Sequence, residues 1–238
     1  MKKIQQIKTQ IFADGAAKAD MLEMYRNSYI KGFTTNPTLM RRAGIANYES
    51  FARDILSAIP DRPISFEVIA DDFTEMERQA RRITTWGRLV SVKIPITNTK
   101  RESSVPLICK LSQDGVALNV TAIFTLSQVQ DVVAAVSGGA QCYVSVLAGR
   151  IADSGLDPVP IMAAAVDRLR AASNAQLIWG SARELLNIFQ ADEIGCHVIT
   201  VTNEILKKIS LLGKDPDEYS LETVKMFYED AMIAGYRL

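Results

Sequence analysis

Lys93 lies where a lysine side chain can do covalent chemistry. It belongs to an apolar stretch, residues 89–94, whose side chains alternate between the two faces of a strand. Val90, Val92 and Ile94 share the face suited to packing against helices, so the lysine amine points to the opposite side. Burial there favours the uncharged amine, the form that attacks a carbonyl carbon to make a Schiff base. The alternative is a lysine whose charged end reaches solvent at the end of the strand.

Polar side chains recur near the same end of four further β-rich stretches. They are Asp14, Thr34, Thr35, Asn36, Ser65, Glu67, Asn119 and Thr121. Alternation puts Ser65 and Glu67 on a common face, and it does the same for Asn119 with Thr121. If both faces point inward, a carboxylate, an amide and a hydroxyl converge near Lys93. Each residue alone is also explained as a turn, a helix cap or a solvated strand position. A lysine clustered with carboxylates, however, is typical of an active site.

Two arginines follow later strands. Arg150 comes after residues 140–146, and Arg183 comes after residues 176–180. The planar guanidinium group suits phosphate, and the loops after late strands of a barrel often bind phosphate. A surface ion pair is the alternative for either arginine. As a pair on adjacent loops, they predict a small phosphorylated substrate.

Eight short β-rich stretches, alternating with segments of helical periodicity, would position these residues. We expect strands at 9–14, 31–35, 63–69, 89–94, 115–121, 140–146, 176–180 and 196–200, and helices that include 72–85, 100–112, 126–136, 158–171 and 182–190. Eight strand-and-helix units in 238 residues favour an α/β fold with a single domain, 1–238, formed by one (β/α)8 barrel, the TIM barrel. A doubly wound open sheet is the alternative.

The segment 220–234 carries apolar residues at roughly helical spacing and lies beyond the eight units. We expect an additional C-terminal helix there. Periodicity alone favours packing on its own chain, and contact with a neighbouring subunit is the alternative.

The overall composition narrows the class of partner. The 27 basic residues balance the 27 acidic ones, which argues against a protein held to nucleic acid by its net charge but leaves a local anion site open. No run approaches the ~18 apolar residues of a membrane helix. Three widely spaced cysteines suit neither a disulfide framework nor a metal site and indicate a reducing cytoplasm. The lone histidine, His197, is expected in the core or at its rim rather than in catalysis.

Several motifs at these positions together resemble the transaldolase family, in particular its small bacterial branch, which also contains the fructose-6-phosphate aldolases. The matching stretches are Phe12-Ala13-Asp14, Gly32-Phe33-Thr34-Thr35-Asn36-Pro37-Thr38-Leu39, Ser65-Phe66-Glu67-Val68, Val92-Lys93-Ile94-Pro95, Asn119-Val120-Thr121 and Gly149-Arg150-Ile151, and the tail 223–230 is similar to the family's C-terminal helix. Any one of them is a weak signal, but the combination is specific.

The resemblance implies a (β/α)8 barrel and a class I aldol mechanism with no metal or organic cofactor. Lys93 would form the Schiff base with the ketose C2 carbonyl. Asp14 would be the general base and acid at the C4 hydroxyl, and Glu67 with Thr121 would hold the catalytic water. The substrate-binding residues implied are Thr34, Asn36 and Asn119 for the dihydroxyacetone unit and its surroundings, and Ser145, Arg150, Ser181 and Arg183 for the phosphate.

The resemblance also implies partners and an oligomer. The substrates would be phosphorylated sugars of the pentose phosphate pathway, with sedoheptulose 7-phosphate or fructose 6-phosphate as donor and an aldose phosphate as acceptor. Nucleic acid and membranes are not expected partners. The small branch commonly forms large rings, which implies a homo-oligomer such as a pentamer or decamer.

Two departures from the family pattern leave the reaction open. Glu67 is the residue expected of transaldolases, where the aldolases carry glutamine, but Leu147 and Ala182 replace expected aromatic residues. The alternatives are therefore a transaldolase, a fructose-6-phosphate aldolase, an enzyme acting on an unusual sugar, and a non-catalytic barrel that binds sugar phosphates.

Overall fold

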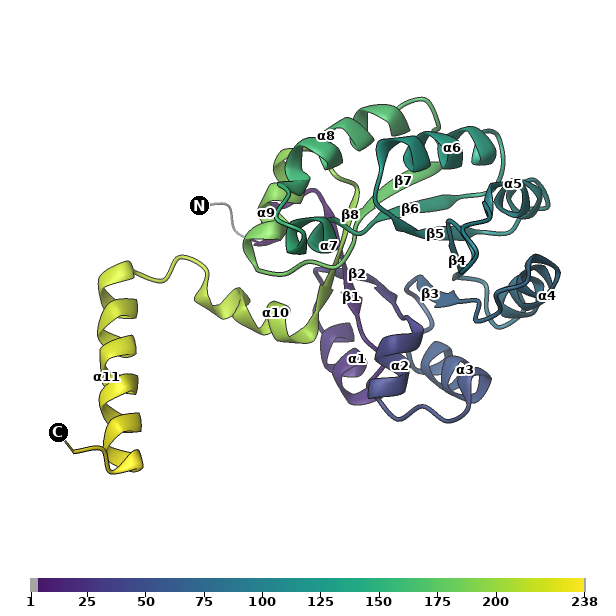
Figure 1. Ribbon diagram of the computed structural model, residues 1–238. Coiled ribbons are helices and arrows are strands. Elements are labelled where there is room, and N and C mark those ends of the chain that lie inside the picture. The colour runs from purple at the N-terminus through teal and green to yellow at the C-terminus, as the bar shows by residue number, and fades with distance from the viewer. Residues whose placement is uncertain (1–3, 238) are drawn as a thin grey trace.

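Eight parallel strands pair in sequence order and close into a barrel surrounded by helices, in a computed structural model that describes residues 4–237 (Figure 1). The strands are β1 (Gln10–Asp14), β2 (Ile30–Thr34), β3 (Ile64–Glu67), β4 (Val90–Pro95), β5 (Leu118–Ile123), β6 (Cys142–Val146), β7 (Ala175–Trp179) and β8 (Val198–Thr202). Pairing of β8 with β1 completes the closure. The predicted (β/α)8 fold is confirmed, and the alternative of an open sheet is excluded.

Helices and short 3-10 turns fill the connections between strands, precede the first strand and follow the last. They are α1 (Lys18–Tyr25), α2 (Pro37–Arg42), α3 (Tyr48–Ala58), α4 (Phe73–Thr84), α5 (Val105–Gln113), α6 (Leu126–Val136), α7 (Ala148–Asp153), α8 (Pro158–Leu169), α9 (Leu186–Glu193), α10 (Asn203–Lys207) and α11 (Pro216–Ala234), with 3-10 turns η1 (Ile4–Gln6) and η2 (Lys208–Leu211). Each predicted strand overlaps an observed one, with ends within three residues.

Two predicted helices begin later than expected, for local reasons. The helix expected from residue 100 begins at Val105, because Thr97 and Ser103 form an antiparallel bridge just before it. The helix expected from residue 182 begins at Leu186. There Ser181 has a left-handed backbone, and the side-chain oxygen of Asn187 accepts the Arg183 and Glu184 amides.

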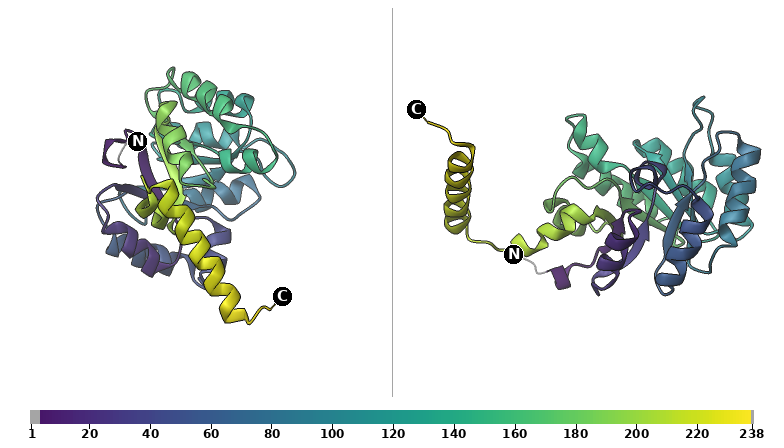
Figure 2. Two further views of the ribbon diagram at one scale, coloured as in Figure 1. Left: turned by 90° about the vertical axis from the view of Figure 1, so that its left-hand side faces the viewer. Right: turned by 90° about the horizontal axis from the view of Figure 1, so that it is seen from below.

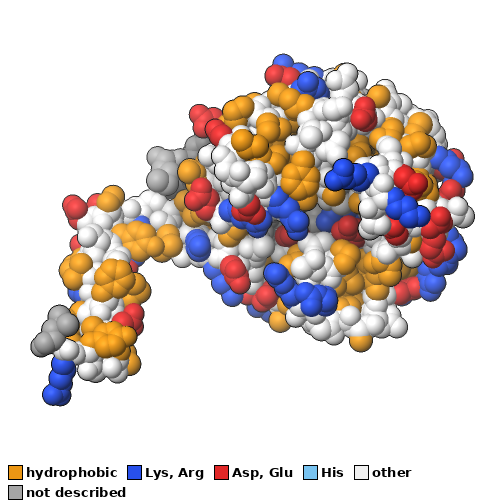
Figure 3. Space-filling view, viewed as in Figure 1, with side chains coloured by type: hydrophobic (Ala, Val, Ile, Leu, Met, Phe, Trp, Pro, Cys, Tyr) orange, Lys and Arg blue, Asp and Glu red, His pale blue; other side chains and the backbone are white. Residues whose placement is uncertain are grey.

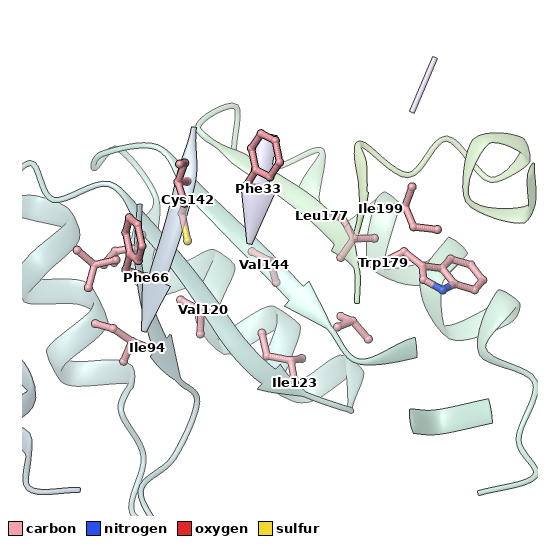
Figure 4. Packing of buried hydrophobic residues seen from close by; sticks show 14 of the residues in the cluster. Phe33, Phe66, Ile94, Val120, Ile123, Cys142, Val144, Leu177, Trp179 and Ile199 are labelled. Atoms are coloured by element: carbon pink, nitrogen blue, oxygen red, sulfur yellow. The ribbon is translucent and has the colours of Figure 1, made fainter. Parts of the chain in front are cut away.

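Helix α4 shows how the sequence builds the outer layer. Asp72 caps its first turn by accepting a hydrogen bond from the Glu75 amide, and Met76, Ala80 and Ile83 recur at helical spacing. All three are buried. Buried apolar residues on other helices likewise pack against the barrel. Figure 4 shows the result, a continuous apolar layer that includes Phe33, Phe66, Val120, Trp179 and other outward-facing strand residues.

Helix α11 stands away from the barrel. It is joined to β8 through α10 and η2, and none of its residues is buried (Figures 1 and 2). The prediction of a C-terminal helix at 220–234 is confirmed and extended to Pro216, where Asp215 caps the first turn. The expectation that it packs on its own chain is wrong, because the segment before it leads outward and leaves its apolar residues exposed (Figure 3). Within residues 4–237, no helix, α11 included, is long and apolar enough to span a bilayer.

Candidate active site

A cavity of about 320 Å³ opens at the carboxyl ends of the strands, where a (β/α)8 barrel carries its active site. Side chains of both charges surround the hollow in the space-filling view (Figure 3). The predicted residues that line it are Asp14, Thr34, Asn36, Glu67, Lys93, Asn119, Thr121, Ser145, Arg150 and Ser181. Thus every predicted site residue except Arg183 reaches one cavity.

Aromatic and aliphatic side chains form the floor of this cavity. Phe12, Tyr143, Ile178 and Val198 make a cluster of their own, and each lies two residues before a cavity residue on its strand. Strand alternation therefore places them inside the barrel, one layer below the site. The Phe12 ring lies against Gly32 of β2, where a Cβ would come within 2.7 Å of the ring. The floor closes the barrel to water beneath the polar groups.

Lys93 on β4 is 8% exposed and projects into the cavity. Its Nζ lies 3.3 Å from Oε2 of Glu67 and donates a hydrogen bond of 3.2 Å to the carbonyl oxygen of Thr35. Strand register produces this arrangement, because Glu67 of β3 and Asn119 of β5 are the direct partners of Lys93. The predicted alternation of β4 is confirmed, and the amine does not extend into bulk solvent.

Asp14 ends β1 and lines the same cavity. The hydroxyl of Thr34 donates to its Oδ1 at 2.8 Å. Burial raises the pKa of Asp14 above its usual value, although the charge of Lys93 and the Thr34 hydrogen bond act in the opposite direction. Asp14 therefore takes up a proton more readily than an exposed aspartate.

Two asparagines keep polar atoms available for a ligand. Asn119 donates from Nδ2 to the Ser65 hydroxyl at 3.0 Å, and its buried Oδ1 has no hydrogen-bond partner within residues 4–237. A buried unpaired carbonyl is unfavourable by about 1–3 kcal/mol, so a ligand hydroxyl that donated to it would bind favourably. The Oδ1 of Asn36 caps α2 by accepting from the Leu39 amide, which leaves its Nδ2 to act as a donor.

A bulge in β5 turns two consecutive residues toward the cavity. Pairing with β6 shifts between Val120 and Ile123, so Thr121 and Ala122 stand opposite Ser145 alone, and all three line the cavity. Ala122 has φ of 60°, a left-handed backbone that is unfavourable for a residue with a Cβ. Strained backbone of this kind gathers at functional sites, and here it sits at the cavity wall.

Arg150 enters the cavity from α7, beside the loop that follows β7. A Cβ on Gly149 would lie 1.6 Å from the carbonyl oxygen of Ser181, so only glycine allows this loop to cross α7 so closely. Ser181 has φ of 60° and lines the same cavity as Arg150. No carboxylate among residues 4–237 lies within ion-pair distance of Arg150. Its guanidinium is the unpaired cation on this wall.

Arg183 does not line the cavity. Its Nε and one terminal nitrogen bind the two carboxylate oxygens of Asp153 at 3.0 and 2.5 Å, in an exposed ion pair. Of the two departures from the family pattern, Leu147 lines the cavity, whereas Ala182 is buried outside it. His197 is half-buried at the start of β8, where its Nδ1 accepts from the Leu177 amide. This agrees with its predicted place at the rim of the core.

Sequence reasoning missed three contributors. Thr200 lines the cavity from β8, and its position in the predicted strand 196–200 could have revealed it. The Thr35 carbonyl that accepts from Lys93 is a backbone group and has no residue-type signal. Tyr48 of α3 donates its hydroxyl to the Glu67 carbonyl at 2.8 Å, a contact across 19 positions that periodicity does not predict.

The barrel and its lysine-carboxylate cavity agree with what the sequence comparison shows. The profile of the transaldolase/fructose-6-phosphate aldolase family matches residues 11–236, and the chain belongs to this family. It is 33% identical to a probable transaldolase of Dehalococcoides mccartyi over 84% of this chain and 89% of that protein. It is 32% identical to a probable transaldolase of Thermoplasma volcanium over 93% of this chain and 94% of that protein. Among solved structures, dihydrodipicolinate synthase from Rhodopseudomonas palustris aligns with a TM-score of 0.59 at 13% identity, covering 97% of this chain and 81% of that one, which shows the shared fold.

Proposed function

We propose that the protein is a transaldolase that moves a dihydroxyacetone unit from a ketose phosphate to an aldose phosphate through a Schiff base on Lys93. The donor would be sedoheptulose 7-phosphate or fructose 6-phosphate. The observation that carries this proposal is the buried Lys93 amine, 3.3 Å from Glu67 in a cavity that Asp14 also lines. Family membership and the probable transaldolases among its relatives support it.

In the first half of the proposed reaction, the Lys93 amine adds to C2 of the ketose, and loss of water gives an iminium ion. Glu67 and Thr121 would hold the water molecule that carries protons in this step. Asp14 would then take the proton of the C4 hydroxyl as the C3–C4 bond breaks. The electrons of that bond pass to the iminium nitrogen, which leaves an enamine on Lys93 and releases an aldose.

In the second half, the enamine carbon adds to the aldehyde of the acceptor and Asp14 returns the proton to the new hydroxyl. Hydrolysis of the iminium ion frees the product ketose and Lys93. The unpaired Oδ1 of Asn119 would accept from a hydroxyl of the dihydroxyacetone unit. Arg150, with the hydroxyls of Ser145 and Ser181, would hold the phosphate at the opposite wall.

Leu147 is the observation behind a second candidate function, net aldol cleavage, as in the fructose-6-phosphate aldolases. It lines the cavity where the resemblance leads us to expect an aromatic residue associated with this choice. Incubation with fructose 6-phosphate, with and without erythrose 4-phosphate, distinguishes the two. Transfer predicts products only when the acceptor is present. Glyceraldehyde 3-phosphate and free dihydroxyacetone accumulating without an acceptor would instead identify an aldolase.

We further propose that the protein works as a homo-oligomer, a pentamer or decamer, in the cytoplasm, with α11 as the assembly element. Support comes from the apolar side chains that α11 exposes, among them Phe227, Tyr228 and Ile233, at 63%, 66% and 86%. Light scattering should give a multiple of 26.2 kDa for the full chain and a smaller particle for a chain ending at Gly213. An unchanged number of subunits, with the barrel still folded by circular dichroism, would exclude α11 from assembly.

A further inference from the structure

The guanidinium group of Arg183 binds the carboxylate of Asp153 through the nitrogens that would otherwise be available to an anionic ligand. The two side chains meet in a bidentate pair, with N–O distances of 3.0 and 2.5 Å, the geometry that arginine also uses for phosphate. The stem of Arg183 runs past Gly149, since its Cγ lies 3.2 Å from the position of a Cβ there. The side chain of Arg183 thus passes the residue before Arg150, and its guanidinium group binds Asp153 and does not line the cavity.

The pair of Asp153 and Arg183 affects how many cations are available to a phosphate in the cavity. The charged residues that line the cavity are Asp14, Glu67, Lys93 and Arg150, and of the two basic ones Lys93 forms an ion pair, with Glu67. A phosphate dianion entering the cavity meets one unpaired cation, Arg150. Arg183 is the nearby second cation, and Asp153 neutralises it.

Asp153 also acts on Arg150. Hydrogen bonds from Arg183, followed by the charges of Arg183 and Arg150, hold the pKa of Asp153 below its usual range. The carboxylate is therefore ionised at neutral pH and lies within the electrostatic field of both arginines. The Arg183 and Asp153 side chains are 48% and 52% exposed, and exposed pairs of this kind are weak enough to exchange partners.

We infer that Asp153 is a specificity-determining residue, which holds Arg183 away from the cavity and so limits how strongly the site prefers phosphorylated over unphosphorylated sugars. This inference rests on the proposed function in taking the cavity to be a sugar-phosphate site. Phosphate exchanges with the carboxylate as the partner of Arg183, and no covalent bond changes.

The test compares the Asp153→Asn variant with the unaltered protein. Inorganic phosphate and fructose 6-phosphate are the probes that carry phosphate, and dihydroxyacetone is the probe without it. We expect phosphate binding to tighten and KM for fructose 6-phosphate to fall, each by about two- to fivefold, the range of a weak surface pair. The amount of dihydroxyacetone adduct trapped by borohydride should stay the same. In the double variant Asp153→Asn with Arg183→Gln, the gain should disappear.

Asp167→Asn is the matched control, because Asp167 forms an exposed ion pair with Arg170 on α8, outside the cavity. It should change neither phosphate affinity nor KM. Unchanged or weaker phosphate binding in Asp153→Asn would overturn the inference, and so would a gain that persists without Arg183. If dihydroxyacetone leaves no adduct on Lys93 in the unaltered protein, the proposed function fails, while the titration with inorganic phosphate still decides the role of Asp153.

Discussion

Lys93 and Glu67 are register partners on adjacent strands, and their charged atoms lie 3.3 Å apart. Parallel pairing of β3 with β4 places the two residues side by side through the backbone, so their side chains begin at adjacent positions. In the proposed reaction the Lys93 nitrogen becomes the positively charged iminium ion. A fixed carboxylate next to it would stabilise that ion without rearrangement.

Replacement of Asp14 by asparagine tests the acid-base assignment. Asparagine keeps the shape of the side chain but cannot take the C4 hydroxyl proton. We expect kcat for transfer to fall by about 10²- to 10⁴-fold, the usual contribution of a general base. Trapping of dihydroxyacetone on Lys93 should survive, because that step precedes bond cleavage. A kcat within tenfold of the unaltered enzyme would contradict the assignment.

The same variant predicts a pH-dependent change in stability. Burial raises the pKa of Asp14 from 3.8, so between the two values the folded protein holds a proton that the unfolded chain has released. Stability therefore falls as pH rises through this window, and the protein is less stable above the window than it would be if Asp14 kept its ordinary pKa. Asp14→Asn should raise the thermal midpoint at pH 7, by about 2–4 °C for each kcal/mol relieved. The difference in thermal midpoint between Asp14→Asn and the unaltered protein should narrow toward pH 4. A lower midpoint for the variant at pH 7 would contradict the argument from burial of Asp14.

Tyr48→Phe removes the hydroxyl that donates to the Glu67 carbonyl. Loss of one such hydrogen bond should lower the free energy of unfolding by about 1 kcal/mol, measured by urea denaturation. Because the contact anchors the end of β3, kcat should also fall while KM stays constant. Tyr29→Phe is the control and should change neither quantity, because the Tyr29 hydroxyl has no hydrogen-bond partner within residues 4–237. A stable variant with full kcat would remove Tyr48 from the support of the site.

Gly149→Ala tests the close passage between α7 and the loop after β7. The added methyl would lie 1.6 Å from the Ser181 carbonyl, so the loop must move. We expect a loss of about 1–3 kcal/mol in stability and a higher KM for fructose 6-phosphate, since Ser181 shifts relative to Arg150. Gly87→Ala is the control, because its nearest atoms lie at an ordinary 3.5 Å. Equal effects of the two substitutions would refute the argument from packing.

The barrel and most of its site could be predicted from the sequence because both depend on local periodicity. Alternation along β4 is enough to direct Lys93 inward, and parallel pairing then brings Glu67 and Asn119 beside it. The strand ends were the least certain part. The far end of β5, which extends to Ile123, includes a bulge at Thr121 and Ala122 that no residue pattern predicts.

Features that depend on contacts between distant segments could not be predicted. The partner of Arg183 is set by a left-handed residue, Ser181, and by the position of Asp153 thirty residues earlier. For Arg183, the sequence alone leaves a surface ion pair as the alternative to phosphate binding. In the same way, the apolar pattern of α11 predicts a helix but does not say which surface it packs against. The role of Arg183 as a phosphate ligand stays a prediction.

The most direct test of the account is borohydride reduction in the presence of fructose 6-phosphate, followed by mass mapping of the modified lysine. Formation of the Schiff base predicts a reduced adduct on Lys93. It also predicts that Lys93→Met abolishes both the adduct and turnover, while Lys208→Met, an exposed lysine in η2, preserves both. The absence of any adduct on Lys93 with every ketose tried, or turnover retained in Lys93→Met, would contradict the proposed enzyme and favour a barrel that only binds sugar phosphates.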